Sequence, residues 1–389
     1  MDREKDPPGL ALARAISRLS LVVLAVSGTA TLLASYSRPQ GSTPPPGASC
    51  VAIRGVPGPE DLELETRDSG TARLLISSQD RRPDPLPQGA IYGLGASDDR
   101  PRRLPLVGRD GCSFHPHGMS LVVHDGKSYL YVINHHDEAD TRPGAGCLAG
   151  AKDLAKVSSV EVFQVEQEAL RFLTRLADPE KLTNPNDLVA LPDGTVWVTN
   201  PADGFAAVRE GLFRRNVDSR LVHFTCTLPP AKPGCPGKWE EGPRFGTYLN
   251  GIGERNEGQE LFVASTAEGR IYRLETASAR AESSSGPEVL AEVAGPDNLS
   301  WADATRTRLL VAGHPSLRSF LQHKASARAP SPSQVTELDL ASGSKPVFED
   351  DGGQISAASV AVRVGDSWFF GQVFEPFVLR CPKFVGGVR

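Results

Sequence analysis

The chain repeats one short arrangement of residues six times. Each copy contains a small polar cluster, a β-like run, a turn and a second β-like run, as in Asn186-Asp187, LVAL, Pro192-Asp193-Gly194 and TVWVTN. The copies begin at residues 60, 117, 186, 250, 297 and 356, which lie 47 to 69 residues apart. Asp-Gly between β-branched or aromatic runs is a strong hairpin signal. Repetition at this period indicates a propeller or an array.

We therefore expect an all-β, six-bladed β-propeller over residues 50–389. Gly and Pro number 38 and 32 in 389 residues, which favours many tight turns over long helices. A two-domain β-sandwich is the alternative, but it does not explain the repeated polar starts. The net charge of −5 argues against a general basic surface for nucleic acid. The chain also lacks the GxGxxG, Walker A and GxSxG signatures.

The N-terminus carries an uncharged apolar run from Leu19 to Ala34, preceded by Arg14 and Arg18. Its length lies between that of a signal-peptide core and a membrane-spanning helix of about 20 residues. Residues 1–37 therefore predict either a cleaved signal peptide or a retained membrane anchor, and residues 38–49 a Pro-rich linker. Either segment implies export to an extracellular or periplasmic location.

Export implies an oxidising milieu, in which the six cysteines can pair. Cys50 and Cys381 stand at the two ends of the expected propeller, so a bond between them would join its first strand to its last. Two further pairs complete the set, and the alternative is free buried thiols. These pairs are Cys226 with Cys235, and Cys112 with Cys147.

The polar starts of the repeats predict a metal site. The innermost strands of a propeller run along the central channel in the same direction, so residues at their starts converge at one end. The converging side chains are two carboxylates and three amides, namely Glu60, Asp297, Asn186, Asn250 and Asn298. Calcium accepts six to eight such hard oxygen donors, whereas zinc and copper prefer His and Cys. The alternative is that Asn and Asp only form turns here.

Two neighbouring carboxylates suggest a second ion. Asp61 and Asp187 each lie one residue past an expected ligand, so their side chains point to the other side of their strands. Together they could hold a deeper, enclosed structural ion.

Four of the eight histidines, residues 115, 117, 135 and 136, fall within one hairpin. His117 begins an expected inner strand and His135 ends the next strand, so both can approach the same end of the channel. Neutral imidazole is the usual general base for activating water. A zinc site of His115, His117 and His135 is the alternative. We interpret His115, His124, His136 and His323 otherwise as surface residues.

Seven motifs occur in the order FHPHGMS, VINHHD, NPNDLVA, LNGI, PDNLS, GHP and GQVF. Together they resemble the paraoxonase (serum paraoxonase/arylesterase) family, which lies within the gluconolactonase-like six-bladed calcium propellers. The resemblance extends from Cys50 to Cys381. It implies a disulfide between these two cysteines that closes the propeller, and a hydrophobic N-terminus that is not cleaved.

The resemblance also implies roles for individual residues. Two calcium ions are implied, one catalytic and one structural. The implied ligands of the catalytic ion are Glu60, Asn186, Asn250, Asp297 and Asn298. The implied ligands of the structural ion are Asp61, Asp187 and the backbone carbonyl of Met119. His117 matches the general base and His135 its assisting partner. The positions that match the substrate pocket are Tyr248, His314, Val373 and Phe374.

One departure concerns the histidine pair. In the family, an acidic residue supports the second histidine. The preceding Asn is kept as Asn200, but the expected acid is Pro201 here, and Asp203 is a candidate substitute.

The resemblance implies a calcium-dependent hydrolase (lactonase and arylesterase) that acts on small-molecule lactones and aryl esters. The alternatives are a sugar lactonase of gluconolactonase type, and a non-catalytic exported calcium-binding propeller that binds a partner. A retained N-terminal segment would add membrane association.

Overall fold

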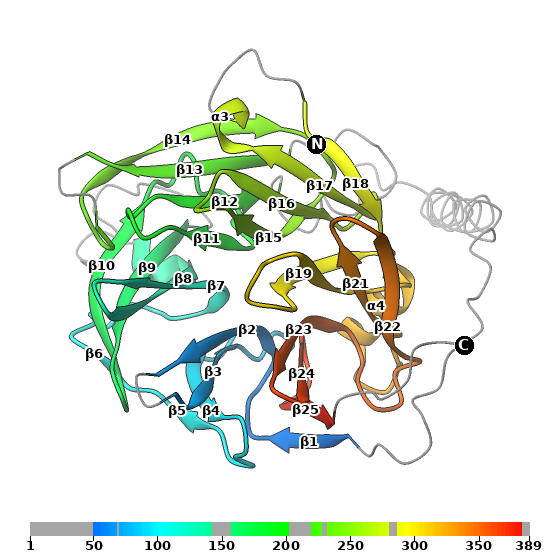
Figure 1. Ribbon diagram of the computed structural model, residues 1–389. Coiled ribbons are helices and arrows are strands. Elements are labelled where there is room, and N and C mark those ends of the chain that lie inside the picture. The colour runs from blue at the N-terminus through cyan, green and yellow to red at the C-terminus, as the bar shows by residue number, and fades with distance from the viewer. Residues whose placement is uncertain are drawn as a thin grey trace, which may run out of the picture. The chain divides into compact units, whose positions relative to one another are not determined.

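The computed structural model describes residues 50–67, 70–141, 157–201, 219–227, 232–279 and 286–382. These residues form six β-sheets arranged around an axis as the blades of a propeller (Figure 1). The expected fold class is therefore confirmed. The expected N-terminal segment and linker, Cys147 and Asp203 lie outside the described residues. No helix in the described ranges has the length and hydropathy to cross a membrane.

The blades contain four strands each, with a fifth in the second blade. The strands of the first blade are β2 (Pro59–Thr66), β3 (Ala72–Ser78), β4 (Ala90–Gly95) and β5 (Arg102–Arg103). Those of the second blade are β7 (Pro116–His124), β8 (Lys127–His136), β9 (Val157–Val165), β10 (Leu170–Ala177) and β6 (Leu106–Val107), which pairs parallel to β10. Those of the third blade are β11 (Leu188–Ala190), β12 (Val196–Asn200), β13 (Arg220–Cys226) and β14 (Gly237–Arg244).

The remaining three blades follow the same antiparallel order. The strands of the fourth blade are β15 (Leu249–Arg255), β16 (Glu260–Ser265), β17 (Arg270–Glu275) and β18 (Glu288–Glu292). Those of the fifth blade are β19 (Pro296–Trp301), β20 (Arg308–Gly313), β21 (Ser333–Asp339) and β22 (Gly343–Asp350). Those of the sixth blade are β23 (Ala358–Val364), β24 (Ser367–Gln372), β25 (Phe377–Pro382) and β1 (Val51–Arg54). Short helices are η1 (Glu138–Thr141), α3 (Thr276–Ala279) and α4 (Leu317–Ala325).

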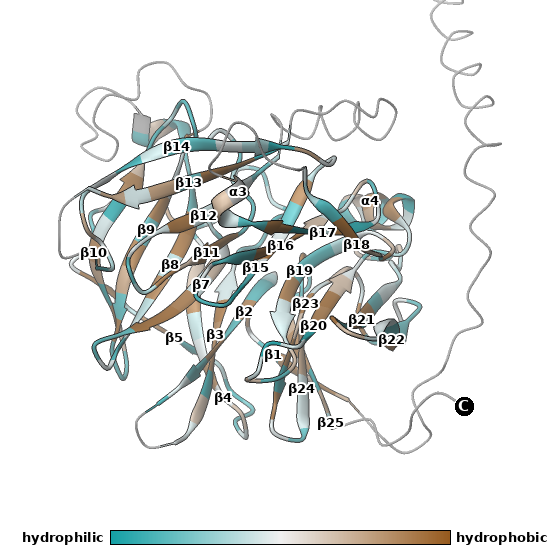
Figure 2. Cartoon of the chain, turned by 45° about the horizontal axis from the view of Figure 1, so that its top comes forward, coloured by the Kyte–Doolittle hydropathy of each residue, from teal (hydrophilic) through white to brown (hydrophobic). Residues whose placement is uncertain are grey.

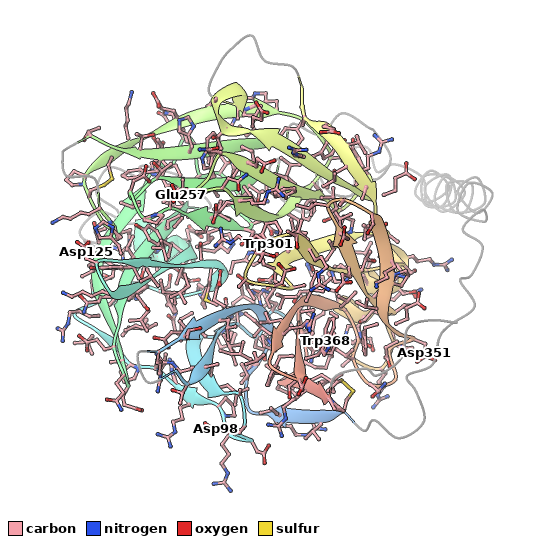
Figure 3. All side chains as sticks on the ribbon, in the orientation of Figure 1. Asp98, Asp125, Glu257, Trp301, Asp351 and Trp368 are labelled. Carbon is pink, nitrogen blue, oxygen red and sulfur yellow. A yellow bond between two sulfur atoms is a disulfide. The ribbon has the colours of Figure 1, made fainter. Side chains whose placement is uncertain are left out.

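Six inner strands surround the axis, and each lies at the start of one sequence repeat. They are β2, β7, β11, β15, β19 and β23, and consecutive ones contact each other around the ring (Figure 1). Figure 3 shows Trp301, the last residue of β19, close to the axis, whereas Asp98 and Asp351 lie at the periphery. This arrangement places the polar starts of the repeats near one another.

The blades are held together by hydrophobic cores between neighbouring sheets. Leu62 of β2, for example, lies in one cluster with Ile76 of β3 and Val360 of β23. The strands near the axis are therefore mostly apolar, as β8 and β16 show in Figure 2, while β14 and β22 at the rim are largely hydrophilic. Each sheet packs against a neighbouring blade on both of its faces, so the strands near the axis need apolar side chains on both faces.

The sixth blade closes the ring because it combines both ends of the propeller. β1 pairs antiparallel with β25, with Ile53 opposite Val378. The disulfide joins Cys50, just before β1, to Cys381 within β25, across a sequence separation of 331. A second bond links Cys226 to Cys235, as expected. The expected pairing of Cys112 involves Cys147, outside the described residues.

We predict that the closing disulfide contributes more to stability than the local one. The chain-entropy model gives about 5–6 kcal/mol for a loop closed by Cys50–Cys381, and about 2–3 kcal/mol for Cys226–Cys235. The double variant Cys50→Ala/Cys381→Ala should therefore melt at a lower temperature than Cys226→Ala/Cys235→Ala, its matched control. Differential scanning calorimetry measures both. Equal melting temperatures would contradict the role of the terminal bond as the closure of the ring.

Candidate functional site

A cavity of about 210 Å³ lies at the end of the channel where the inner strands begin. It is lined by residues from the starts of five repeats, namely Glu60, His117, Asn186, Asn250 and Asp297. The pocket positions implied by the resemblance, Tyr248, His314, Val373 and Phe374, line the same cavity. The structure therefore brings together residues that are up to 314 positions apart in the sequence, between Glu60 and Phe374.

Four buried oxygen atoms at this site have no hydrogen-bond donor among the described residues. They are Glu60 Oε2, Asn186 Oδ1, Asn250 Oδ1 and Asn298 Oδ1. The amide nitrogen atoms are occupied: Asn298 Nδ2 donates to Glu60 Oε1 at 2.9 Å, and Asn250 Nδ2 donates to Thr266 Oγ1 at 3.1 Å. A buried acceptor without a partner costs about 1–3 kcal/mol. Four unpartnered acceptors in one cluster can be satisfied together by a cation.

The residues fit a calcium ion. All five expected ligands offer oxygen, and the two carboxylates among them balance a charge of +2, while water can fill the remaining positions. The site differs from the usual clusters of ionisable ligands because three of its donors are amides. No group of three or more His, Cys, Asp or Glu residues in the described ranges could hold a metal ion.

The two carboxylates are placed where their negative charge is poorly solvated. Burial raises the pKa of Glu60, and the positive charge of Arg81 offsets part of this rise. Burial likewise raises the pKa of Asp297. His314 Nε2 lies 2.7 Å from Asp297 Oδ2 and favours the ionised carboxylate. A bound divalent cation would favour both anions strongly.

Asp61 and Asp187 lie buried beneath this cavity, outside its lining. One oxygen of each carboxylate accepts a main-chain N–H group from a neighbouring blade. Asp61 Oδ2 accepts from Met119 at 2.7 Å, and Asp187 Oδ2 accepts from Ile252 at 2.9 Å. Met119 thus contacts Asp61 through its backbone N–H. Burial, then the charge of Asp187, raises the pKa of Asp61 well above its usual value. Two buried like charges of this kind favour a counter-cation.

Glycines at the starts of two inner strands allow the blades to approach closely. A Cβ atom on Gly118 would lie 2.5 Å from Asp187 Oδ1 and 2.6 Å from the carbonyl oxygen of Asn186. A Cβ atom on Gly251 would lie 2.4 Å from the carbonyl oxygen of Asp297. A larger residue at position 118 would therefore clash with Asn186 and Asp187, and one at position 251 would clash with Asp297 in the next blade.

His117 and His135 form a hydrogen-bonded pair. His117 Nδ1 lies 2.9 Å from His135 Nε2, and His117 Nε2 lies 3.7 Å from Glu60 Oε1. The His117 side chain keeps 21% of its surface exposed in the cavity. Burial, then the charge of Arg81, lowers the pKa of His117 to about 3; burial, then the charge of His117, lowers that of His135. Both imidazoles are therefore neutral near pH 7, and His117 Nε2 can accept a proton.

Ser158 contacts the second histidine of the pair. Its Oγ lies 2.9 Å from His135 Nδ1, so His135 can donate to Ser158 and accept from His117. Asn200 is engaged elsewhere, because its Nδ2 donates to the carbonyl of Lys181 at 2.7 Å and its Oδ1 accepts from Asn184 N at 2.9 Å. Asp203, the candidate substitute, lies outside the described residues.

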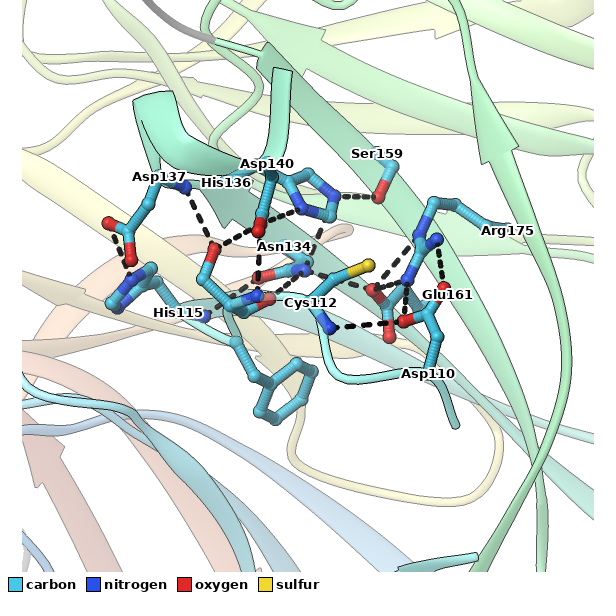
Figure 4. A network of polar contacts seen from close by, with 12 residues as sticks. Asp110, Cys112, His115, Asn134, His136, Asp137, Asp140, Ser159, Glu161 and Arg175 are labelled. Atoms are coloured by element: carbon cyan, nitrogen blue, oxygen red, sulfur yellow. Dashed lines mark hydrogen bonds and ion pairs between the residues drawn. The ribbon is translucent and has the colours of Figure 1, made fainter. Parts of the chain in front are cut away.

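His115 and His136 are buried, contrary to the interpretation as surface residues. His115 bonds to Gln79 and Asp137, and not to His117. His136 Nδ1 lies 3.0 Å from Asp140 Oδ2, and its Nε2 lies 2.8 Å from Ser159 Oγ (Figure 4). The partners of His115 argue against a zinc site with His117 and His135. His323 is also buried, with Nε2 2.8 Å from Glu375 Oε2.

Sequence reasoning missed several residues of the cavity. Arg81 follows β3, Thr266 follows β16, and Leu317, Phe320 and Leu321 of α4 form an apolar wall. The sequence contained a pattern that could have identified Arg81 and Thr266. The second strand of each blade runs back toward the cavity, so residues at or just after its end can line it, as His314 does after β20.

Comparisons with known proteins support the fold and give one distant relative. No family model matches the chain. Serum paraoxonase/arylesterase 2 of Rattus norvegicus is 26% identical over 163 residues, which make up 39% of this chain and 40% of that protein. The match thus spans less than half of the relative. A luciferin-regenerating enzyme has a similar structure, with a TM-score of 0.51 and 11% identity over 88% of this chain and 99% of that one. This second likeness concerns the fold alone.

We predict that Asn250→Ala lowers the calcium content of the purified protein by about one ion per chain, because it removes one of the few oxygen donors. Metal analysis after dialysis measures this. Asn134→Ala is the matched control, since Asn134 is equally buried but its oxygen accepts from His115 N at 2.7 Å. Unchanged calcium in the Asn250 variant would contradict the assignment.

Proposed function

We propose that the protein is a calcium-dependent hydrolase of lactones and aryl esters. The observation that carries the proposal is the group of buried, unpartnered oxygen atoms at a cavity that is also lined by His117, one member of a neutral histidine pair. The name of the distant relative, a paraoxonase/arylesterase, supports the same class of reaction.

The catalytic ion would be held by Glu60, Asn186, Asn250, Asp297 and Asn298. A second, structural ion would lie at Asp61 and Asp187, next to Met119. When bound, calcium supplies positive charge that polarises the substrate carbonyl. His314 and Asn298 orient the carboxylates through their hydrogen bonds to Asp297 and Glu60.

The histidine pair handles the proton. In the proposed step, His117 Nε2 takes a proton from water while the water oxygen bonds to the carbonyl carbon. The acyl C–O bond then breaks, and the same proton passes to the leaving oxygen, which gives a hydroxy acid from a lactone. His135, held by Ser158, fixes the proton on His117 Nδ1 and so keeps Nε2 free to act.

The cavity wall favours substrates with an apolar part. Leu317, Phe320 and Leu321 of α4 face the same space as Phe374. Phe320 also packs on His314, with ring centroids 4.4 Å apart. A polyhydroxylated sugar lactone would leave its hydroxyl groups poorly paired against this wall.

We also propose that the chain is exported. The disulfides Cys50–Cys381 and Cys226–Cys235 support an oxidising location. Whether residues 1–37 act as a signal or as an anchor concerns residues outside the described ranges.

We predict that His117→Gln lowers the turnover of a lactone such as δ-valerolactone by about 100-fold or more, because general bases contribute about 10²–10⁴-fold. The calcium content and the melting temperature in calcium should stay close to those of the wild type. Removal of calcium by a chelator should abolish activity and lower the melting temperature together. Near-normal turnover of the His117 variant would refute its role as the base.

We predict that Ser158→Ala lowers kcat about tenfold with little change in KM, since one lost hydrogen bond corresponds to about 1.4 kcal/mol. Ser159→Ala is the matched control: Ser159 is the next residue of β9, but it bonds to His136. That variant should lower the melting temperature without a comparable loss in kcat. Steady-state kinetics and calorimetry on both variants test this. Equal kcat values for the two would remove Ser158 from the proton relay.

A further inference from the structure

Arg81 lines the same cavity, and the function proposed above does not use it. It follows β3 and reaches across to two neighbouring strands. Its Nη1 donates to the carbonyl oxygens of Gly58 and Gln79, both at 3.1 Å, and its Nη2 donates to that of Pro116 at 3.2 Å. Three main-chain acceptors therefore fix the position of the guanidinium.

These three bonds leave two N–H groups of Arg81 unused. A guanidinium has five N–H donors. Within the part of the chain that the structure describes, Nε–H and one N–H of Nη2 have no acceptor. Nε and Nη2 lie on the same edge of the guanidinium, an edge that can bind a carboxylate through two hydrogen bonds. Arg81 lines the cavity, so these donors are candidates for a contact with a ligand there.

The charge of Arg81 also favours an anionic ligand. Arg81 makes no ion pair within 4.0 Å with a described carboxylate, although Glu60 and Asp297 act on it electrostatically. In the proposed function these two carboxylates balance the calcium ion, so they do not also balance the positive charge of Arg81. An anionic group on the substrate would balance it.

The location of Arg81 restricts where this anionic group can sit. Gly58 lies two residues before Glu60, and Pro116 adjoins His117. The guanidinium is thus fixed between the strand that carries an expected calcium ligand and the strand that carries the base. A carboxylate bound there must be close to the reacting carbonyl, and a cavity of about 210 Å³ suits a compact molecule.

We infer that the cavity selects lactones and esters that carry a carboxylate close to the reacting carbonyl, and that Arg81 is the residue that binds this carboxylate. The inference rests on the proposed hydrolase function, whose substrate class it narrows. Leu317, Phe320 and Phe374 would contact the apolar remainder of the substrate.

The first experiment compares two lactones that differ in charge alone. The calcium-loaded wild type should hydrolyse 5-oxotetrahydrofuran-2-carboxylate with a kcat/KM about 10- to 100-fold above that for the neutral 2-carboxamide, as expected for a charge-assisted bidentate contact. Arg81→Met should remove this preference, and Arg81→Lys should keep only part of it. Lys324→Met is the control, because Lys324 lines the cavity from α4.

The second experiment measures binding without hydrolysis. Titration calorimetry should show that 3-oxocyclopentane-1-carboxylate, a ketone that cannot be hydrolysed, binds the wild type more tightly than its carboxamide does. This difference should disappear in Arg81→Met. If that variant does not fold, the wild-type preference and Arg81→Lys decide.

The outcomes separate the two proposals. Equal hydrolysis of the charged and neutral lactones would overturn the inference and leave the hydrolase function standing. Hydrolysis of neither, with binding of the ketone carboxylate that depends on Arg81, would overturn the hydrolase function and support the anion site. A preference lost in Lys324→Met but kept in Arg81→Met would overturn the assignment to Arg81.

Discussion

The structure depends on side chains that satisfy the main chain across the central channel. The inner strand of each blade has one edge without a strand partner, and its polar groups need acceptors or donors. Asp61 accepts the N–H of Met119, Asp187 accepts that of Ile252, and Ser120 Oγ accepts that of Ala190. The same short polar side chains that close the ring therefore gather carboxylates and amides at the axis. The contacts that join neighbouring blades therefore also place the oxygen atoms that could bind a cation.

This arrangement gathers buried carboxylates at the axis. Burial, then the charges of Asp187, Glu60 and Glu63, raises the pKa of Asp61, and burial raises that of Glu63 to about 7. The unpartnered amide oxygens add a further cost. An ion at each of the two proposed sites would relieve these penalties, which would couple the free energy of folding to the capacity for catalysis. The glycines at 118 and 251 belong to this coupling, since they let the ligand pairs approach.

The sequence predicted what local pattern determines. The six repeats gave the number of blades, and the common direction of the inner strands placed Glu60, Asn250 and Asp297 at one cavity. Contacts that depend on the register between strands were not accessible. Ser158 and Ser159 are adjacent residues of the same type, yet one bonds to His135 and the other to His136, because neighbours on a strand face opposite sides. The burial of His115 and His136 is of the same kind.

The cavity combines an apolar wall with charged side chains. Its α4 wall is apolar, whereas Glu60, Asp297 and Arg81 bring charges to the same cavity. Arg81 is held by main-chain carbonyls instead of by Glu60 or Asp297, so its positive charge is not consumed by the metal site. A guanidinium in that position costs desolvation energy that a neutral substrate cannot repay. The fold keeps this charge at a fixed point next to the residue that precedes His117, as the inferred role in substrate recognition requires.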